Sequence, residues 1–135
     1  MTFGSADDMI ARVNAQVQEA QDRAAQATQF RMGVESVRGR ALSPRGEVEV
    51  EADASGRLTD ITLTAAALAH KPDVLGRLIV QTSHQAHQRA GEQAVQLAAD
   101  AFGEDSQTVS RLRAEVTERV GPEPAGPSGA TIDYR

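Results

Sequence analysis

Cysteine and tryptophan are absent from this chain of 135 residues, and one tyrosine and three phenylalanines are its only aromatic residues. Without cysteine the chain has no disulfide framework and no thiolate zinc site. It also lacks any run of about 18 apolar residues, so no membrane-spanning helix is expected and a membrane is not among the expected partners. These absences argue against a disulfide-stapled module, a thiolate metal centre and a transmembrane protein.

Large core-forming side chains are scarce. Hydrophobic residues make up 40% of the sequence but aromatic residues only 3%, and much of the apolar content is alanine. A small domain with such side chains buries little surface alone, so we expect two copies to pair. The N-terminal residues include Asp7 and Asp8 and lack the basic and then apolar order of a secretory signal, which favours a cytoplasmic protein.

Negative charge dominates the chain. The formal net charge is -5, and thirteen of the fourteen basic residues are arginine, with Lys71 as the exception. Nucleic-acid-binding proteins usually carry a basic surface, so any contact with DNA has to be local.

Residues 46–64 carry the clearest pattern. Apolar residues alternate with acidic ones, so that Val48, Val50 and Ala52 share one face and three glutamates share the other. This alternation predicts a strand with one buried side. A second strand follows the Ser55-Gly56 turn, and residues 34–43 predict a strand before the turn at Pro44-Arg45-Gly46.

The two turns predict a strand pairing. The first turn sets Ala41 opposite Val48, Gly39 opposite Val50, Val37 opposite Ala52, Arg40 opposite Glu49 and Arg38 opposite Glu51. The second sets Ala52 opposite Thr59, Val50 opposite Ile61 and Val48 opposite Leu63. Both registers place the apolar residues on one face, which predicts a three-stranded antiparallel meander covered by helices.

Helices are predicted on both sides of the meander. From about Ser5, a potential N-cap, to Phe30, apolar residues recur at steps of three and four, which is coiled-coil spacing. This seam consists of Ile10, Val13, Val17, Ala20, Ala24 and Ala27. Gly33 is the expected stop, a long helix is expected from Pro72 to about Phe102, and Ser106 is expected to cap a shorter one.

Three segments follow from this pattern. Residues 1–103 form the predicted dimerising domain, residues 104–120 a short helical extension, and residues 121–135 a tail rich in proline and glycine that is predicted to be disordered.

The order of helix, three antiparallel strands and proline-started helix, with Gly46-Glu-Val-Glu-Val-Glu51 leading through residues 54–63, resembles the YbaB/EbfC family. The similarity spans roughly residues 7–102. It implies an α+β fold in an intertwined homodimer whose helices project as tweezer-like arms, and a nucleoid-associated, double-stranded-DNA-binding function in the cytoplasm. Related small proteins also occur as accessory components of type VII secretion loci, which implies the alternative of a protein-interaction factor without DNA binding.

Arginine is the usual partner of phosphate groups. Arg38 and Arg40 are expected to be neutralised by glutamates across the hairpin, whereas Arg45 and Arg57 lie in turns without an assigned partner. The candidate DNA contacts are Arg12, Arg23, Arg31, Arg45 and Arg57, and solvated arginines that aid solubility are the alternative. The candidate dimer interface consists of Ile10, Val13, Val17, Ala20, Val48, Val50, Ile61 and Leu63.

No catalytic or cofactor site is predicted. His84 and His87 stand one helical turn apart, but no nearby cysteine or carboxylate completes a metal site, so a solvated helix face is expected there. Ser83 beside His84 belongs to no nucleophile elbow or triad order, and no glycine-rich loop cradles a phosphate. The sequence therefore predicts a binding protein without cofactor or metal.

Overall fold

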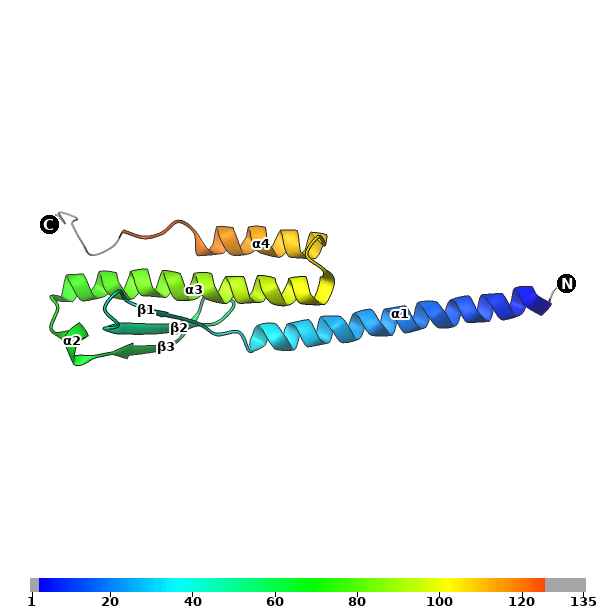
Figure 1. Cartoon of the computed structure of the whole chain (residues 1–135), viewed down its shortest axis with the longest axis horizontal. Coiled ribbons are helices and arrows are strands. Elements are labelled where there is room, and N and C mark those ends of the chain that lie inside the picture. Colours follow the sequence, from blue (N-terminus) through cyan, green and yellow to red (C-terminus); the bar gives the residue numbers. More distant parts are fainter. Residues whose placement is uncertain (1–2, 126–135) are drawn as a thin grey trace.

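The computed structural model describes residues 3–125, with side chains from residue 5 onward. The elements are α1 (Phe3–Glu35), β1 (Gly39–Leu42), β2 (Val48–Ala52), β3 (Leu58–Leu63), α2 (Ala65–Leu68), α3 (Pro72–Phe102) and α4 (Gln107–Val120). Figure 1 shows the sheet, α3 and α4 in layers, with α1 projecting from one end of this body. The order of helix, three antiparallel strands and long helix confirms the predicted α+β fold.

The core lies between the sheet and α3. The strand order is β1-β2-β3, and the apolar residues of β1 and β2 pack against α3. This cluster contains Ala41, Val48, Val50, Ala52, Ala67, Leu78 and Ala86. All six residues of β3 are exposed, because α3 covers the other two strands and leaves this edge bare.

The bounds of α3 and the start of α4 agree with the predictions. Pro72 stands at the start of α3 and Gly103 caps its end. The Ser106 hydroxyl accepts a hydrogen bond from the Val109 amide at 3.2 Å, which caps α4. Figure 1 shows that α4 folds back along α3, and a second apolar cluster fills this contact with Ala98, Ala99 and Val109 at its centre.

The predicted bounds of the first helix were wrong. The helix begins at Phe3 rather than at a Ser5 cap, and it continues through Gly33 to Glu35, so the first strand is only Gly39–Leu42. Gly33 is a packing position rather than a stop, because a Cβ there would lie 3.3 Å from Leu97 Cδ1.

The predicted register of the first hairpin was also wrong. Ala41 lies opposite Val50 and Gly39 opposite Ala52, a shift of two residues. The reason is a longer turn, in which the Gly46 amide donates to the Ser43 carbonyl at 2.8 Å and Gly46 takes the left-handed φ of 70°. A shift of two keeps every side chain on its face, so the predicted buried face is confirmed.

The second hairpin follows the prediction except at its turn. Val48 pairs with Leu63 and Val50 with Ile61, as expected. Ala52 lies opposite Leu58 instead of Thr59, because a bulge interrupts the ladder at this point.

The two remaining sequence predictions concern the C-terminal tail and membrane-spanning helices. The predicted disordered tail falls mainly on residues 126–135, which lie outside the described residues. Within the described part of the chain, no helix is long and apolar enough to cross a membrane.

Candidate nucleic-acid interface

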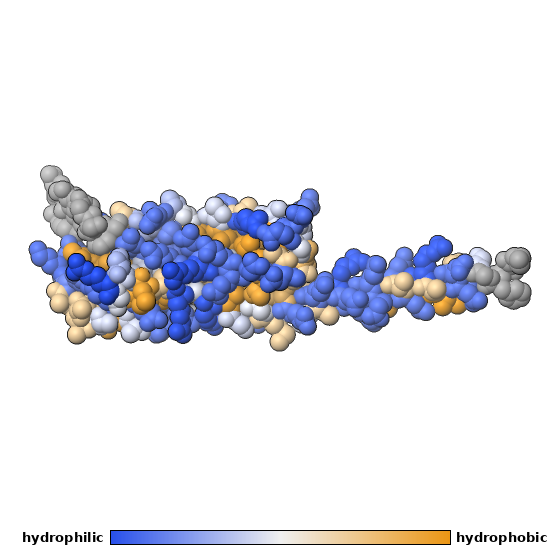
Figure 2. Space-filling model, viewed as in Figure 1, coloured by the Kyte–Doolittle hydropathy of each residue, from blue (hydrophilic) through white to orange (hydrophobic). Residues whose placement is uncertain are grey.

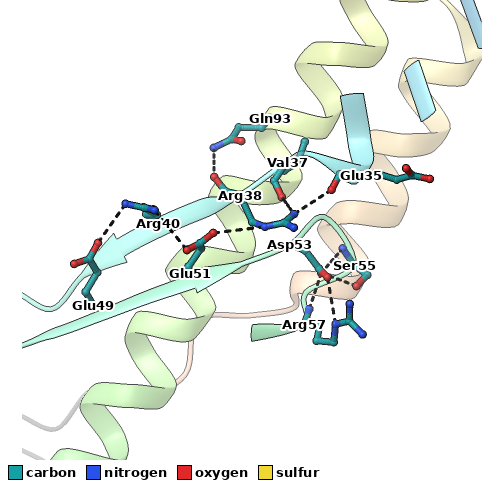
Figure 3. Close-up of polar contacts among 10 residues, drawn as sticks. All are labelled: Glu35, Val37, Arg38, Arg40, Glu49, Glu51, Asp53, Ser55, Arg57 and Gln93. Carbon is teal, nitrogen blue, oxygen red and sulfur yellow. Dashed lines mark hydrogen bonds and ion pairs between the residues drawn. The ribbon is translucent and has the colours of Figure 1, made fainter. Parts of the chain in front are cut away.

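The open face of the sheet carries paired charges. Arg38 lies 3.5 Å from Glu51, and Arg40 lies 4.0 Å from Glu49 and 3.6 Å from Glu51 (Figure 3). The cross-strand ion pairs expected from the sequence are therefore present despite the shifted register, because long side chains reach diagonal neighbours. A phosphate would have to compete with these glutamates.

The outer edge of β1 is occupied by side chains of α3. Arg89 Nη1 donates to the Arg40 carbonyl at 2.6 Å, and Gln93 Nε2 donates to the Arg38 carbonyl at 3.0 Å. Among residues 5–125, no side-chain hydrogen bond reaches the outer edge of β3. The two edges of the sheet differ, and only β3 leaves backbone groups available to a further strand.

The turn between β2 and β3 is organised by Asp53. Its carboxylate accepts hydrogen bonds from the Ser55 hydroxyl at 2.6 Å and from the amides of Ser55 and Arg57 at 3.0 Å (Figure 3). The Ser55 hydroxyl first, and then the amides and the Arg57 charge, lower the pKa of Asp53. Arg57 Nε lies 3.4 Å from this carboxylate, so the prediction that Arg57 lacks a partner was wrong.

The five predicted DNA contacts do not form one patch. Arg12 and Arg23 lie on α1 and Arg31 at its base, whereas Arg45 and Arg57 lie in turns at opposite ends of the meander. Arg23 pairs with Glu19 at 3.5 Å. Arg12, Arg31 and Arg45 form no ion pair within residues 5–125, so no carboxylate of this part of the chain competes with a phosphate for them.

The arm, which we define as residues 5–29 of α1, has every side chain exposed. It carries four carboxylates and two arginines, a net charge of -2. A phosphate backbone would be repelled by such a surface as a whole. Arg12 and Arg23 are therefore weaker candidates than the arginines of the body.

Arg45 has basic neighbours that sequence reasoning missed. Glu47, which is buried two residues further on, contacts His70 Nε2, so the β1–β2 turn meets the junction of α2 and α3. Lys71 follows His70, and Arg77 lies in the second turn of α3. Within the described residues Arg45, Lys71 and Arg77 have no ion pair, and we call them the turn-end cations.

The predicted dimer residues fall into two groups. Val48 and Val50 are fully buried beneath α3 within one chain, whereas Ile61 and Leu63 remain 42% and 38% exposed. On the arm, Ile10, Val13 and Val17 are at least half exposed, and Ala20 is exposed beside them. Two apolar surfaces are thus left for a partner, one on the arm and one at β3.

The two helical histidines are not on a solvated face. The His84 ring lies 3.2 Å from the Gly121 carbonyl, where the end of α4 covers it, so the expectation of a solvated setting was wrong. Burial first, and then Arg119 and His84, lower the pKa of His87, which favours its neutral form. In the part of the chain described here, no group of three or more histidine or carboxylate side chains could hold a metal ion.

The family model of the YbaB/EbfC DNA-binding family matches residues 7–105. The chain belongs to this family. Its members are nucleoid-associated DNA-binding proteins, and the resemblance expected from the meander is confirmed. A comparison with curated proteins gave no significant match, and a comparison with solved structures gave none either. The match ends before α4 begins at Gln107, so α4 is a feature of this chain beyond the family region.

Proposed function

We propose that this protein is a non-enzymatic, nucleoid-associated homodimer of the cytoplasm that binds duplex DNA through phosphate contacts with little base specificity. The observation that carries the proposal is the family match over residues 7–105. Phosphate contacts position a protein on DNA without reading sequence. They also allow an acidic protein to bind, provided that its cations are gathered in one place.

The turn-end cations supply such a place. Lys71 and Arg77 lie at the N-terminal end of α3, whose backbone amides add positive potential, and the contact of Glu47 with His70 joins the turn that carries Arg45 to this end. The nearest carboxylates in the sequence are Glu47, which is buried against His70, and Asp73 in the first turn of α3. The three cations outnumber these two carboxylates, in contrast to the arm, so this end is the best phosphate site that residues 5–125 offer.

A homodimer is supported by the surfaces that one chain leaves bare. Arm residues such as Ile10 and Val13 expose large side chains to water, and β3 exposes Leu58, Ile61 and Leu63. Exposed apolar surface of this extent on a small protein marks an interaction site. A second copy is the simplest partner, because the fold buries few large side chains on its own.

The acidic arm favours a second candidate function. A net charge of -2 on residues 5–29 and a formal charge of -5 on the whole chain suit a protein-interaction factor, such as a type VII secretion accessory factor of the same fold, that does not bind DNA. The two candidates differ in how they respond to salt.

Retardation of an arbitrary duplex by purified protein, measured at about 50 mM and about 200 mM salt, tests the proposal. Three phosphate contacts from each copy of a dimer would give a slope of log K against log salt of about -5, which lowers the affinity roughly a thousandfold over this range. Absence of retardation at the lower salt concentration would contradict DNA binding and favour the interaction factor.

A further inference from the structure

A groove lies at the base of the arm, where α1, α3 and α4 meet the β2–β3 turn. It has a volume of about 480 Å³ and is lined mainly by apolar side chains, including Phe30, Phe102, Leu112 and Val116. The rings of Phe30 and Phe102 meet edge to face with centroids 5.3 Å apart. Figure 2 shows hydrophobic surface on the body close to this junction. Apolar clefts of this size are typical of small-molecule sites.

One face of α1 and one face of α4 form the walls of the groove. The lining residues recur at steps of one, three and four on α1 and of three and four on α4, which places each set on a single helix face. They are residues 27, 30, 31 and 34 of α1 and residues 108, 112, 116 and 119 of α4. From residue 108 to residue 119 the helix rises about 16 Å, so the groove has room for an extended chain.

Two cations border this groove. Arg31 on α1 and Arg119 on α4 are exposed, and neither forms an ion pair within residues 5–125. No carboxylate is among the lining residues. The carboxylate of Asp53, in the adjacent turn, is already engaged by Ser55 and Arg57. The groove therefore combines an apolar lining with positive charge at its rim, which is complementary to an apolar molecule with one negative end.

We propose that this groove binds a small amphipathic anion, a linear acyl chain that ends in a carboxylate. The chain lies against the apolar side chains of α3 and α4, and the carboxylate accepts hydrogen bonds from the guanidinium groups of Arg31 and Arg119. Two turns of a helix about 10 Å across would fill roughly 850 Å³, so a helical segment of another protein is too large for the groove. Neither the proposed homodimer nor DNA binding is needed for this site.

The wall that α4 contributes lies outside the family match. Leu112, Val116 and Arg119 belong to this wall, whereas the matched region ends at residue 105. The site is thus completed by the helical extension, which gives that extension a role. A ligand held between α1 and α4 would also join the base of the arm to the body.

Titration calorimetry of the full-length protein with dodecanoate, kept below the concentration at which it forms micelles, tests the proposal. We expect saturable binding of one dodecanoate per chain. Dodecyltrimethylammonium has the same chain length and the opposite charge, so it should bind at least about tenfold more weakly. No saturable binding of dodecanoate would overturn the proposal. Equal binding of the two compounds would also overturn it, because it would indicate adsorption to apolar surface in general.

Neutralising the rim tests the role of the two arginines. Arg31→Gln/Arg119→Gln should weaken dodecanoate binding about tenfold or more, because the carboxylate loses both charged partners. Arg12→Gln/Arg111→Gln is the matched control, because it removes the same charge from the same two helices at positions that do not line the groove. Equal losses in the two variants would show that net charge rather than the groove governs binding, and would contradict the proposal.

Filling the groove tests its location. Ala27 lines the groove from an exposed position on α1, so Ala27→Trp should block dodecanoate while leaving the melting curve unchanged. Ala25→Trp is the matched control, because Ala25 is an exposed alanine of the same helix outside the lining. Dodecanoate binding that survives Ala27→Trp would place the ligand elsewhere and refute this site.

Discussion

Val116 of α4 occupies the space that a side chain on Gly91 would need. A Cβ on Gly91 would overlap Val116 Cγ1, and Gly91 is buried in the middle of α3. Glycine in a helix interior costs about 1 kcal/mol relative to alanine. The close approach of α4 explains why this position of a 31-residue helix nevertheless holds glycine.

Gly91→Ala should destabilise the protein by about 1–3 kcal/mol, because the added methyl group overpacks the contact between α3 and α4. In a Val116→Ala background the same change should be neutral or stabilising, since only the helix-propensity gain remains. Gly76→Ala on the same helix is the matched control, because apart from its chain neighbours and the adjacent helix backbone no atom lies within 4 Å of its Cβ position. Denaturant unfolding measures all four variants, and equal effects at Gly76 and Gly91 would contradict the packing argument.

Local signals in the sequence predicted α3, but they did not determine the register between β1 and β2. Proline at the start and Gly103 at the end fix the helix from the sequence alone. Alternation along β2 has a period of two, so a shift of two residues leaves the pattern unchanged. Only the length of the turn decides the pairing, and that depends on Gly46 and on the contact of Glu47 with His70.

The candidate site likewise has features that the local sequence reveals and others that depend on tertiary contacts. The pairing of Asp53 with Arg57 is local and could have been read from the Asp-x-Ser turn pattern. The grouping of Arg45 with Lys71 depends on tertiary contacts between residues far apart in sequence, so no local signal reveals it. The exposure of β3 likewise follows from where α3 lies, which alternation does not specify.

Val50→Asp should abolish the cooperative melt. Val50 is fully buried between Ala41, Ile61 and α3, and an unpaired carboxylate there should cost several kcal/mol. Val80→Asp is the control, because Val80 is 55% exposed on α3 and should change stability by less than about 0.5 kcal/mol. A thermal melt followed by circular dichroism compares the two, and an unchanged curve for Val50→Asp would refute the assigned core face.

Stability should fall as the pH drops below about 6.5, the ordinary pKa of histidine. Burial and the charge of Arg119 hold the pKa of His87 below this value in the folded protein, while Asp53 acts in the opposite direction. The unfolded chain therefore binds more protons in the window between the two pKa values, so the stabilisation is present above 6.5 and is lost as the pH falls through the folded pKa. His87→Gln should flatten this part of the profile, measured as the free energy of unfolding against pH.

Val17→Glu should disrupt dimerisation, because it places a charge in the centre of the arm seam. Gln18→Glu adds the same charge one residue away, outside the seam, and should leave the dimer intact. Light scattering at micromolar concentration distinguishes the variants. A dimer that tolerates both changes would show that the arm stripe takes no part in the interface.

Arg45→Ala/Lys71→Ala should weaken DNA binding to a similar degree on unrelated duplexes, because phosphate contacts carry no sequence information. Four lost contacts in a dimer would make the slope of log K against log salt shallower by about 3 to 4. Arg38→Ala/Arg40→Ala removes the same charge, but these arginines are already paired with Glu49 and Glu51, so the effect should be smaller. Gel retardation over a salt series measures both. Equal losses would place the contact on the sheet face instead of the turn end, and loss on one duplex alone would indicate that bases are read.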